Sequence, residues 1–166
     1  MLAQPTDFHL DPRLSADCEF VVDLPISRLL LVNNASVPWF ILVPRVDEAT
    51  EMTHLAMPIQ HQLLAEVNQI SQLLEQLYQP QKLNIGALGN VVSQLHIHVI
   101  GRFHSDPAWP SPVWGNLPNN PYIASELPKM LDKIRQCLGY PARVPPQYCL
   151  QFAPHLKGVT GLWPLR

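Results

Sequence analysis

Three short apolar runs follow one another closely near the start of the chain and limit the folds open to it. Residues 19–24 (EFVVDL), 28–33 (RLLLVN) and 39–44 (WFILVP) are rich in β-branched and large apolar residues, and only short turns separate them. Parallel strands need a long crossover connection, so this spacing favours an antiparallel meander over repeated βαβ units.

A long helix and two further strands are expected after the meander. Between Pro58, which suits the first turn of a helix, and a stop at Pro80, apolar residues recur every three or four positions. Such a stripe is typical of an amphipathic helix packed on a core. Residues 82–87 and 94–101 then read as two strands on either side of a glycine-bearing loop.

A last helix is expected near the end of the chain. Asn120 is the expected N-cap, Pro121 the first helical residue, and Gly139 the residue just beyond the helix. Together these elements predict an α+β domain, with an antiparallel sheet of about five strands, one long helix and a C-terminal helix.

Charge and composition narrow the range of partners. The 166 residues carry a formal net charge of −2, which gives no reason to expect binding to nucleic acid or to an acidic membrane. No signal-like segment follows Met1 and no apolar run approaches 18 residues, so a soluble cytoplasmic protein is expected. Three cysteines without CxxC spacing argue against a disulfide framework or a zinc knuckle.

Two histidines, His96 and His98, lie one residue apart in the apolar stretch VVSQLHIHVIGRF, residues 91–103. Side chains alternate between the two faces of a strand, so Leu95 and its alternate neighbours would pack on a helix. Gln94, His96 and His98 would share the opposite face. A polar row on one side of a strand is typical of an open sheet face or a cleft.

The residues around these histidines suit phosphate chemistry. Gly86 and Gly89, in the loop NIGALGNVV (residues 84–92), let the backbone approach an anion closely, and Arg102 could reach a phosphate with two donors. A neutral imidazole whose Nδ1–H is held by a hydrogen bond keeps Nε2 free as a nucleophile. A protonated neighbour could then stabilise developing charge on a phosphoryl oxygen.

Two other interpretations of the histidine pair stay open. A His-x-His pair in a strand is also a metal-chelating arrangement, although candidates for a third ligand, such as His104 and Asp106, are few. The pair could also be polar residues without any chemistry.

The stretch QLHIHVI, with a glycine loop before it and Gly-Arg after it, resembles the signature of the histidine triad (HIT) superfamily, His-φ-His-φ-His-φ-φ with φ apolar. LLLVN, VPWFILVPR, the long helix and LNIGALGN occur in the family's order. The resemblance covers about residues 19–103. It makes residues 1–166 a single HIT-like domain with a Pro- and aromatic-rich extension from 104 to 166, expected to be ordered by Trp109, Trp114, Tyr148, Phe152 and Trp163.

The resemblance implies hydrolysis or transfer of nucleotidyl groups through a covalent nucleotidyl-histidine. It makes His96 the nucleophile and His98 a phosphate ligand. It places Asn33 at the ribose, and it assigns phosphate and leaving-group contacts to the loop residues Asn84, Gly89, Asn90 and Val91. It further implies a homodimer and no metal held by the protein, with Mg²⁺ arriving on a polyphosphate such as diadenosine tetraphosphate.

Three departures from the family pattern leave a second function open. Gln94 stands in place of the first histidine of the triad, Phe40 where several members carry another histidine, and Val91 where relatives often have Ser or Thr. Gln94 can still donate and accept hydrogen bonds but cannot become a cation. A nucleotide-binding or sensing module with little turnover is therefore the alternative to a hydrolase, with a metal-dependent enzyme third.

Overall fold

The computed structural model describes residues 8–141, which divide into one unit up to Pro121 and a second unit from Tyr122 onward. Residues 104–121, which the sequence analysis assigned to the extension, belong to the first unit. The expected anchors Tyr148, Phe152 and Trp163 lie outside the described residues. Within the described range, no helix has the length and apolar character needed to span a membrane.

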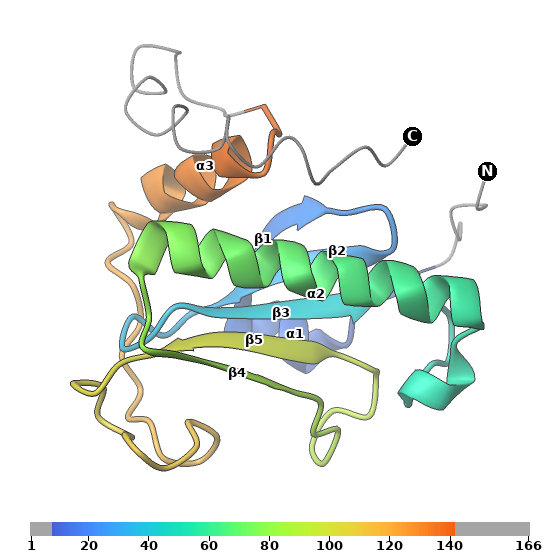
Figure 1. Cartoon of the computed structure of the whole chain (residues 1–166), viewed down its shortest axis with the longest axis horizontal. Helices are drawn as coiled ribbons and strands as arrows, with labels where there is room; N and C mark the ends of the chain where they lie inside the picture. The colour runs from blue at the N-terminus through green and yellow to red at the C-terminus, as the bar shows by residue number, and fades with distance from the viewer. Residues whose placement is uncertain (1–7, 142–166) are drawn as a thin grey trace. The chain divides into compact units, whose positions relative to one another are not determined.

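The first unit is built on a five-stranded antiparallel sheet, as the sequence predicted (Figure 1). Its strands are β1 (Cys18–Asp23), β2 (Ser27–Val32), β3 (Trp39–Pro44), β4 (Lys82–Gly86) and β5 (Ile97–Arg102). They lie in the order β1-β2-β3-β5-β4, and all neighbours are antiparallel. The meander β1–β3 is thus extended by β5, which lies between β3 and the edge strand β4.

Helix α2 (Met57–Tyr78) covers one face of this sheet and packs on β5 and β3 (Figure 1). Pro58 lies in its first turn and Gln79 ends it in the left-handed conformation, directly before Pro80. The predicted stripe is buried from Leu63 to Leu74, and each fully buried side chain contributes about 1.5–3 kcal/mol. The buried side chains of this layer include Leu63, Ile70 and Leu74 from the helix and Phe40, Leu42 and Val99 from the sheet.

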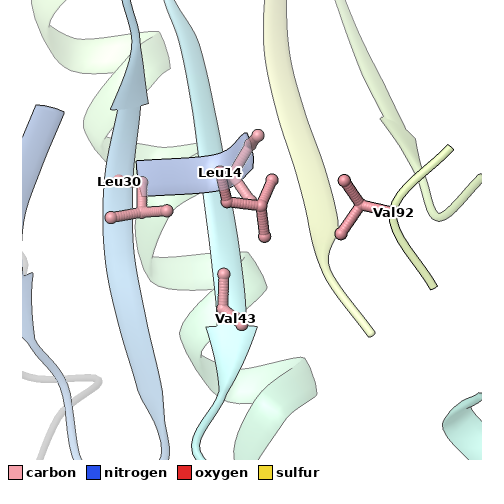
Figure 2. Packing of buried hydrophobic residues seen from close by; sticks show 5 residues of the cluster. Leu14, Leu30, Val43 and Val92 are labelled. Carbon is pink, nitrogen blue, oxygen red and sulfur yellow. The ribbon is translucent and has the colours of Figure 1, made fainter. Parts of the chain in front are cut away.

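The opposite face is covered by a short helix that sequence reasoning missed, α1 (Pro12–Asp17). Its one buried residue, Leu14, packs with Leu30, Ile41, Val43 and Val92 (Figure 2). A second cluster on this face consists of Val37, Ile100 and Val113. A short 3₁₀ helix, Met52–His54, precedes α2 and was also not predicted.

The second unit contains helix α3 (Leu127–Cys137), so the expected helix start at Asn120 and Pro121 is wrong. The carbonyl oxygen of Asn120 accepts a hydrogen bond from the Ala35 amide at 2.6 Å, and its side chain donates to Ser36 Oγ at 3.1 Å. These contacts hold residue 120 at the turn after β2 and in the first unit. Gly139 does follow the helix end, with φ of 81°.

Candidate functional site

His96 and His98 lie together where β5 begins, between β3 and the edge strand β4. The strand starts at Ile97 rather than at residue 94, so His96 directly precedes it and His98 is its second residue. The centroids of the two rings are 4.9 Å apart, and the side chains are only 7% and 6% exposed. His98 pairs across the sheet with Ile41 and with Gly86. It therefore lies on the face opposite α2, as the alternation of side chains predicted.

His96 is held by its own backbone neighbourhood. Its Nδ1 lies 2.6 Å from the carbonyl oxygen of Gln94. Because a carbonyl oxygen can only accept, the proton of a neutral His96 ring belongs on Nδ1. This tautomer leaves a lone pair on Nε2, the arrangement that a nucleophilic imidazole needs.

His98 is held in the opposite way, by a donor. The indole Nε1–H of Trp39 donates to His98 Nδ1 at 2.9 Å, and an indole nitrogen cannot accept. Burial, and to a lesser degree the neighbouring His96, lower the pKa of His98 to about 4. The expected protonated imidazole is therefore wrong for His98 near neutral pH. The ring is neutral there, and it carries its single proton on Nε2.

Trp114 packs against both His98 and Trp39. Its ring centroid lies 5.4 Å from that of His98 and 6.2 Å from that of Trp39, both edge to face. The indole also packs against Gly86, where a Cβ would lie at an ordinary contact distance of 3.5 Å. Aromatic side chains, Trp39 and Trp114, thus do much to bury the His98 ring.

Gln94 does not reach the histidines with its side chain. Its Oε1 accepts from the Asp11 amide and its Nε2 donates to the His9 carbonyl, both at 2.9 Å. The amide therefore holds the N-terminal segment beside the site, while the main-chain carbonyl of the same residue orients His96. Its contribution to the site geometry comes through the backbone.

The loop after β4 is exposed, in contrast to the histidines. Gly89 has φ of 71°, in the region that favours glycine, and Asn90 and Val91 are solvent-exposed beside it. The side chain of Val91 is 76% exposed. Its carbonyl oxygen accepts from Arg13 Nη1 at 3.2 Å, so a guanidinium lies at this loop. Sequence reasoning missed Arg13, because its partner is 78 residues away.

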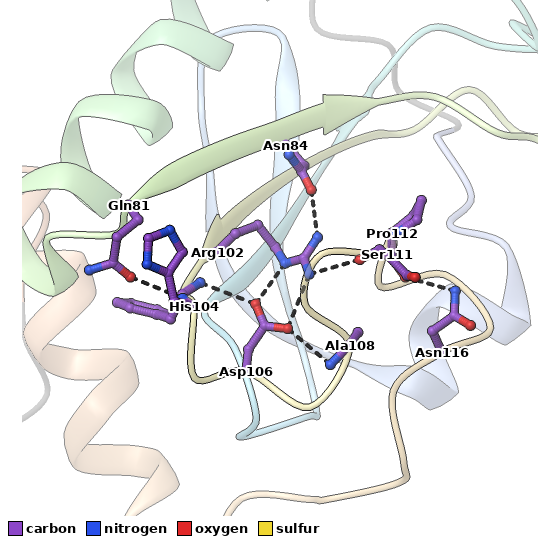
Figure 3. Close-up of polar contacts among 10 residues, drawn as sticks. Gln81, Asn84, Arg102, His104, Asp106, Ala108, Ser111, Pro112 and Asn116 are labelled. Atoms are coloured by element: carbon purple, nitrogen blue, oxygen red, sulfur yellow. Dashed lines mark hydrogen bonds and ion pairs between the residues drawn. The ribbon is translucent and has the colours of Figure 1, made fainter.

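Arg102 has a structural role in place of the expected contact with phosphate. Its side chain is 1% exposed and makes four hydrogen bonds: two to the Asp106 carboxylate, one to Asn84 Oδ1 and one to the Ser111 carbonyl (Figure 3). Burial would raise the pKa of Asp106, but Arg102 and two backbone amides lower it below its usual range. The pair joins β5, β4 and the following loop.

The remaining expected site residues lie on or directly after different strands and on both faces of the sheet. Asn33 directly follows β2, and its amide donates to the Asp17 carbonyl at 3.0 Å. Asn84 lies on β4, with its side-chain oxygen bonded to Arg102. Phe40, expected where several family members carry a histidine, is fully buried opposite Val99 on the face that α2 covers. The β3 residue that contacts His98 is Trp39.

The geometry does not favour a metal centre. Among residues 8–141, no group of three or more His, Cys, Asp or Glu side chains is placed to hold a metal ion. Both Nδ1 atoms are engaged, one with a carbonyl oxygen and one with an indole. The structure thus brings together two imidazoles whose neutral forms differ at the outer nitrogen: His96 Nε2 has a lone pair, and His98 Nε2 carries a proton.

Comparison with known proteins agrees with this geometry. The family model of the HIT domain matches residues 13–105, more than half of the chain. A histidine triad protein from Bradyrhizobium japonicum is 40% identical, with 78% of this chain and 96% of that chain covered and a TM-score of 0.75. One from Sinorhizobium meliloti is 37% identical, covering 81% and 98%, with a TM-score of 0.76. A third, from Marinobacter aquaeolei, is 40% identical, covering 78% and 94%, with a TM-score of 0.75. Among curated proteins, no sequence matches.

Proposed function

The chain belongs to the histidine triad family, and from that premise we propose that it cleaves a nucleotidyl phosphate through a covalent intermediate on His96. Membership suggests nucleotide binding with hydrolase or transferase activity. The substrate we propose is a dinucleoside polyphosphate, such as diadenosine tetraphosphate, or a related adenylyl conjugate. The observation that carries the proposal is the hydrogen bond from His96 Nδ1 to the Gln94 carbonyl, which leaves Nε2 as a free nucleophile.

In the first step, His96 Nε2 attacks the α-phosphorus and a P–N bond forms. The bond from phosphorus to the leaving-group oxygen breaks, and that oxygen keeps the electron pair. The modified ring carries a positive charge because Nδ1 retains its proton, and the Gln94 carbonyl stabilises this charge. His98 Nε2–H and the amides of residues 89–91 are the donors proposed for the phosphoryl oxygens.

In the second step, water attacks the same phosphorus and the P–N bond breaks. Its electron pair returns to Nε2, and a water proton leaves to solvent, so the neutral ring is restored. The site holds no resident metal in this mechanism; Mg²⁺ arrives with the polyphosphate and offsets its charge. A homodimer and a cytoplasmic location stay predictions from the resemblance and the sequence.

One observation favours the second candidate, a nucleotide-binding module with little turnover. The side chain of Val91 extends into solvent at the loop proposed to contact the leaving group, and valine has no hydroxyl to donate a proton there. The side chain of Gln94 is already engaged with the N-terminal segment. Such a module would bind a mononucleotide tightly and release it unchanged.

The deciding experiment compares the wild type with His96→Ala on diadenosine tetraphosphate, diadenosine triphosphate and adenosine phosphoramidate, once with Mg²⁺ and once with a chelator. Released nucleotides are separated by chromatography, and AMP affinity is measured on both proteins. His61→Ala is the control, since His61 is an exposed imidazole on α2, which covers the other face of the sheet.

We expect AMP release by the wild type and by His61→Ala and none by His96→Ala, whose AMP affinity falls much less. Equal rates in His96→Ala and the wild type would refute the role of His96. Tight AMP binding by the wild type without cleavage of any compound would favour the binding module.

A further inference from the structure

The two imidazoles are held by groups of opposite character. A carbonyl oxygen accepts from His96 Nδ1, whereas the Trp39 indole donates to His98 Nδ1. Adjacent histidines of the same sequence context would otherwise each populate both neutral tautomers. Here the first ring directs a lone pair outward from Nε2 and the second directs an N–H.

Trp39 is itself held firmly on the sheet. It lies on β3 opposite Ile100, and it packs against both hydrophobic clusters of this face, the one around Leu14 and the one around Val113. Its ring lies 5.6 Å from the His98 ring, and Trp114 meets it edge on. An indole supported from both sides cannot easily turn its N–H away from His98.

The structure assigns Trp39 as the positioning residue that keeps His98 in the neutral, Nε2-protonated tautomer. This inference rests on the proposed function, in which His98 Nε2–H donates to a phosphoryl oxygen. This role does not require Trp39 to contact the substrate. It acts through His98, by denying Nδ1 the proton and thereby placing a permanent donor at the outer nitrogen.

The electrostatic surroundings support a neutral ring across a wide pH range. Ionisation of His98 would require Nδ1 to take up a proton against a donor that already points at it. Burial acts in the same direction, and its pKa lies at about 4. Among the described residues, the titratable side chain in contact with the His98 ring is His96, and the centroids of the two rings are 4.9 Å apart. The other groups beside it from β3, β4 and the following segment are uncharged: Trp39, Ile41, Gly86 and Trp114.

Charged groups on these strands lie farther along, at the opposite ends of β4 and β5. Lys82 pairs in register with Arg102, and the Arg102 charge is matched by Asp106. The neutral state of His98 therefore depends on burial, on the indole and to a lesser degree on His96, and not on a lysine or arginine of these strands.

The inference is tested on the full chain by NMR, with ¹⁵N-labelled histidine and long-range correlations between ring protons and ring nitrogens. The His98 signals are identified by their loss in His98→Asn. Trp39→Phe keeps an aromatic ring but removes the N–H. Trp114→Phe is the matched control, because Trp114 also contacts this imidazole edge to face but makes no hydrogen bond to it.

In the wild type we expect His98 with a bare Nδ1 and a protonated Nε2 from pH 7 down to about pH 5. The neutral form of His96 should carry its proton on Nδ1. In Trp39→Phe, His98 should average both tautomers and take up a proton at a higher pH. The kcat should fall roughly 2- to 12-fold, the net contribution of one hydrogen bond, and KM should stay unchanged. Trp114→Phe should keep the wild-type tautomer.

A wild-type spectrum with the His98 proton on Nδ1 would overturn the inference, even if Trp39→Phe failed to fold. So would a Trp39→Phe spectrum with an unchanged tautomer and titration. The spectra do not depend on turnover. If they show the expected tautomers and no substrate of the panel is cleaved, the proposed function fails while the tautomer assignment stands.

Discussion

Acid should destabilise the folded chain through His98, and the size of the effect follows from the surroundings of that one imidazole. Burial and the neighbouring His96 lower its pKa from 6.5 to about 4 in the folded protein. Between these two values the unfolded chain binds a proton that the folded chain excludes. Stability therefore rises with pH in this window, and falls as pH drops from 6.5 towards 4.

The magnitude follows from the same two values. Each unit of pKa difference corresponds to about 1.4 kcal/mol, so the linkage relation gives a loss of about 2 kcal/mol at pH 5 and about 3 kcal/mol at pH 4, relative to neutral pH. His98 is only 6% exposed, so solvent screens little of this effect. A domain of this size has a total stability of roughly 5–15 kcal/mol.

Urea unfolding of the wild type and of His98→Asn at pH 7, 5 and 4 measures the effect. Asparagine places an oxygen near the position of Nδ1 and can still accept from the Trp39 indole, but it does not titrate. Other groups in the window, such as Glu66, whose pKa burial raises, titrate in both proteins. Their contributions cancel in the difference.

The wild type should lose about 3 kcal/mol more than His98→Asn between pH 7 and pH 4, since the linkage applies to His98 alone. Parallel pH profiles for the two proteins would refute the reasoning, because they would mean that His98 is protonated at no cost to the fold.

Three further substitutions test contacts around the site. Gln94→Ala should lower the free energy of unfolding by roughly 1–3 kcal/mol, because both hydrogen bonds that hold the N-terminal segment are lost; an unchanged urea midpoint would count against it. Arg13→Gln should raise KM for a polyphosphate and weaken the salt dependence of binding, because a guanidinium is removed from the exposed loop. The control is Lys129→Gln, which makes an equal charge change in the second unit. Equal changes in KM in the two variants would argue against a local contact. Gly101→Ala should cost roughly 1–3 kcal/mol, because its Cβ would lie 2.9 Å from Pro38 Cγ, and a wild-type thermal midpoint would contradict this.

The fold was predictable because its signals are local. The strands of the meander and helix α2 can each be recognised from a local pattern, either side-chain alternation or an apolar stripe with a 3.6-residue period. Pro58 lies in the first turn of the helix and Pro80 follows its end, because proline is tolerated at a helix start but not in its interior. Helix α1 was missed since six residues with a single buried leucine, Leu14, leave no periodic pattern. Asn120 and Pro121 form a convincing local start signal, but a contact with residues 35 and 36 holds them elsewhere.

The histidine pair was predictable for the same reason, since two residues one apart in a strand must share a face. Their partners were not, because they depend on register. Phe40, which was expected where relatives carry a histidine, is the neighbour of Trp39, the residue that contacts His98. A shift of one residue along a strand moves a side chain to the opposite face of the sheet. Only the pairing of β3 with β5 shows that Trp39 is on the histidine side.

Arg102 shows that a residue can fit a phosphate-binding motif in the sequence and still have a structural role in the folded protein. Read locally, an arginine just after the histidines suits a phosphate. In the structure the carboxylate four residues later meets it at 2.8 Å, and both side chains are 1% exposed. A buried guanidinium that is already paired with a carboxylate gains little from binding a phosphate as well. It would also have to break its present hydrogen bonds to contact that phosphate. Among residues 8–141, Arg13 does lie at the exposed loop, and we predict that its guanidinium, rather than that of Arg102, contacts a bound polyphosphate.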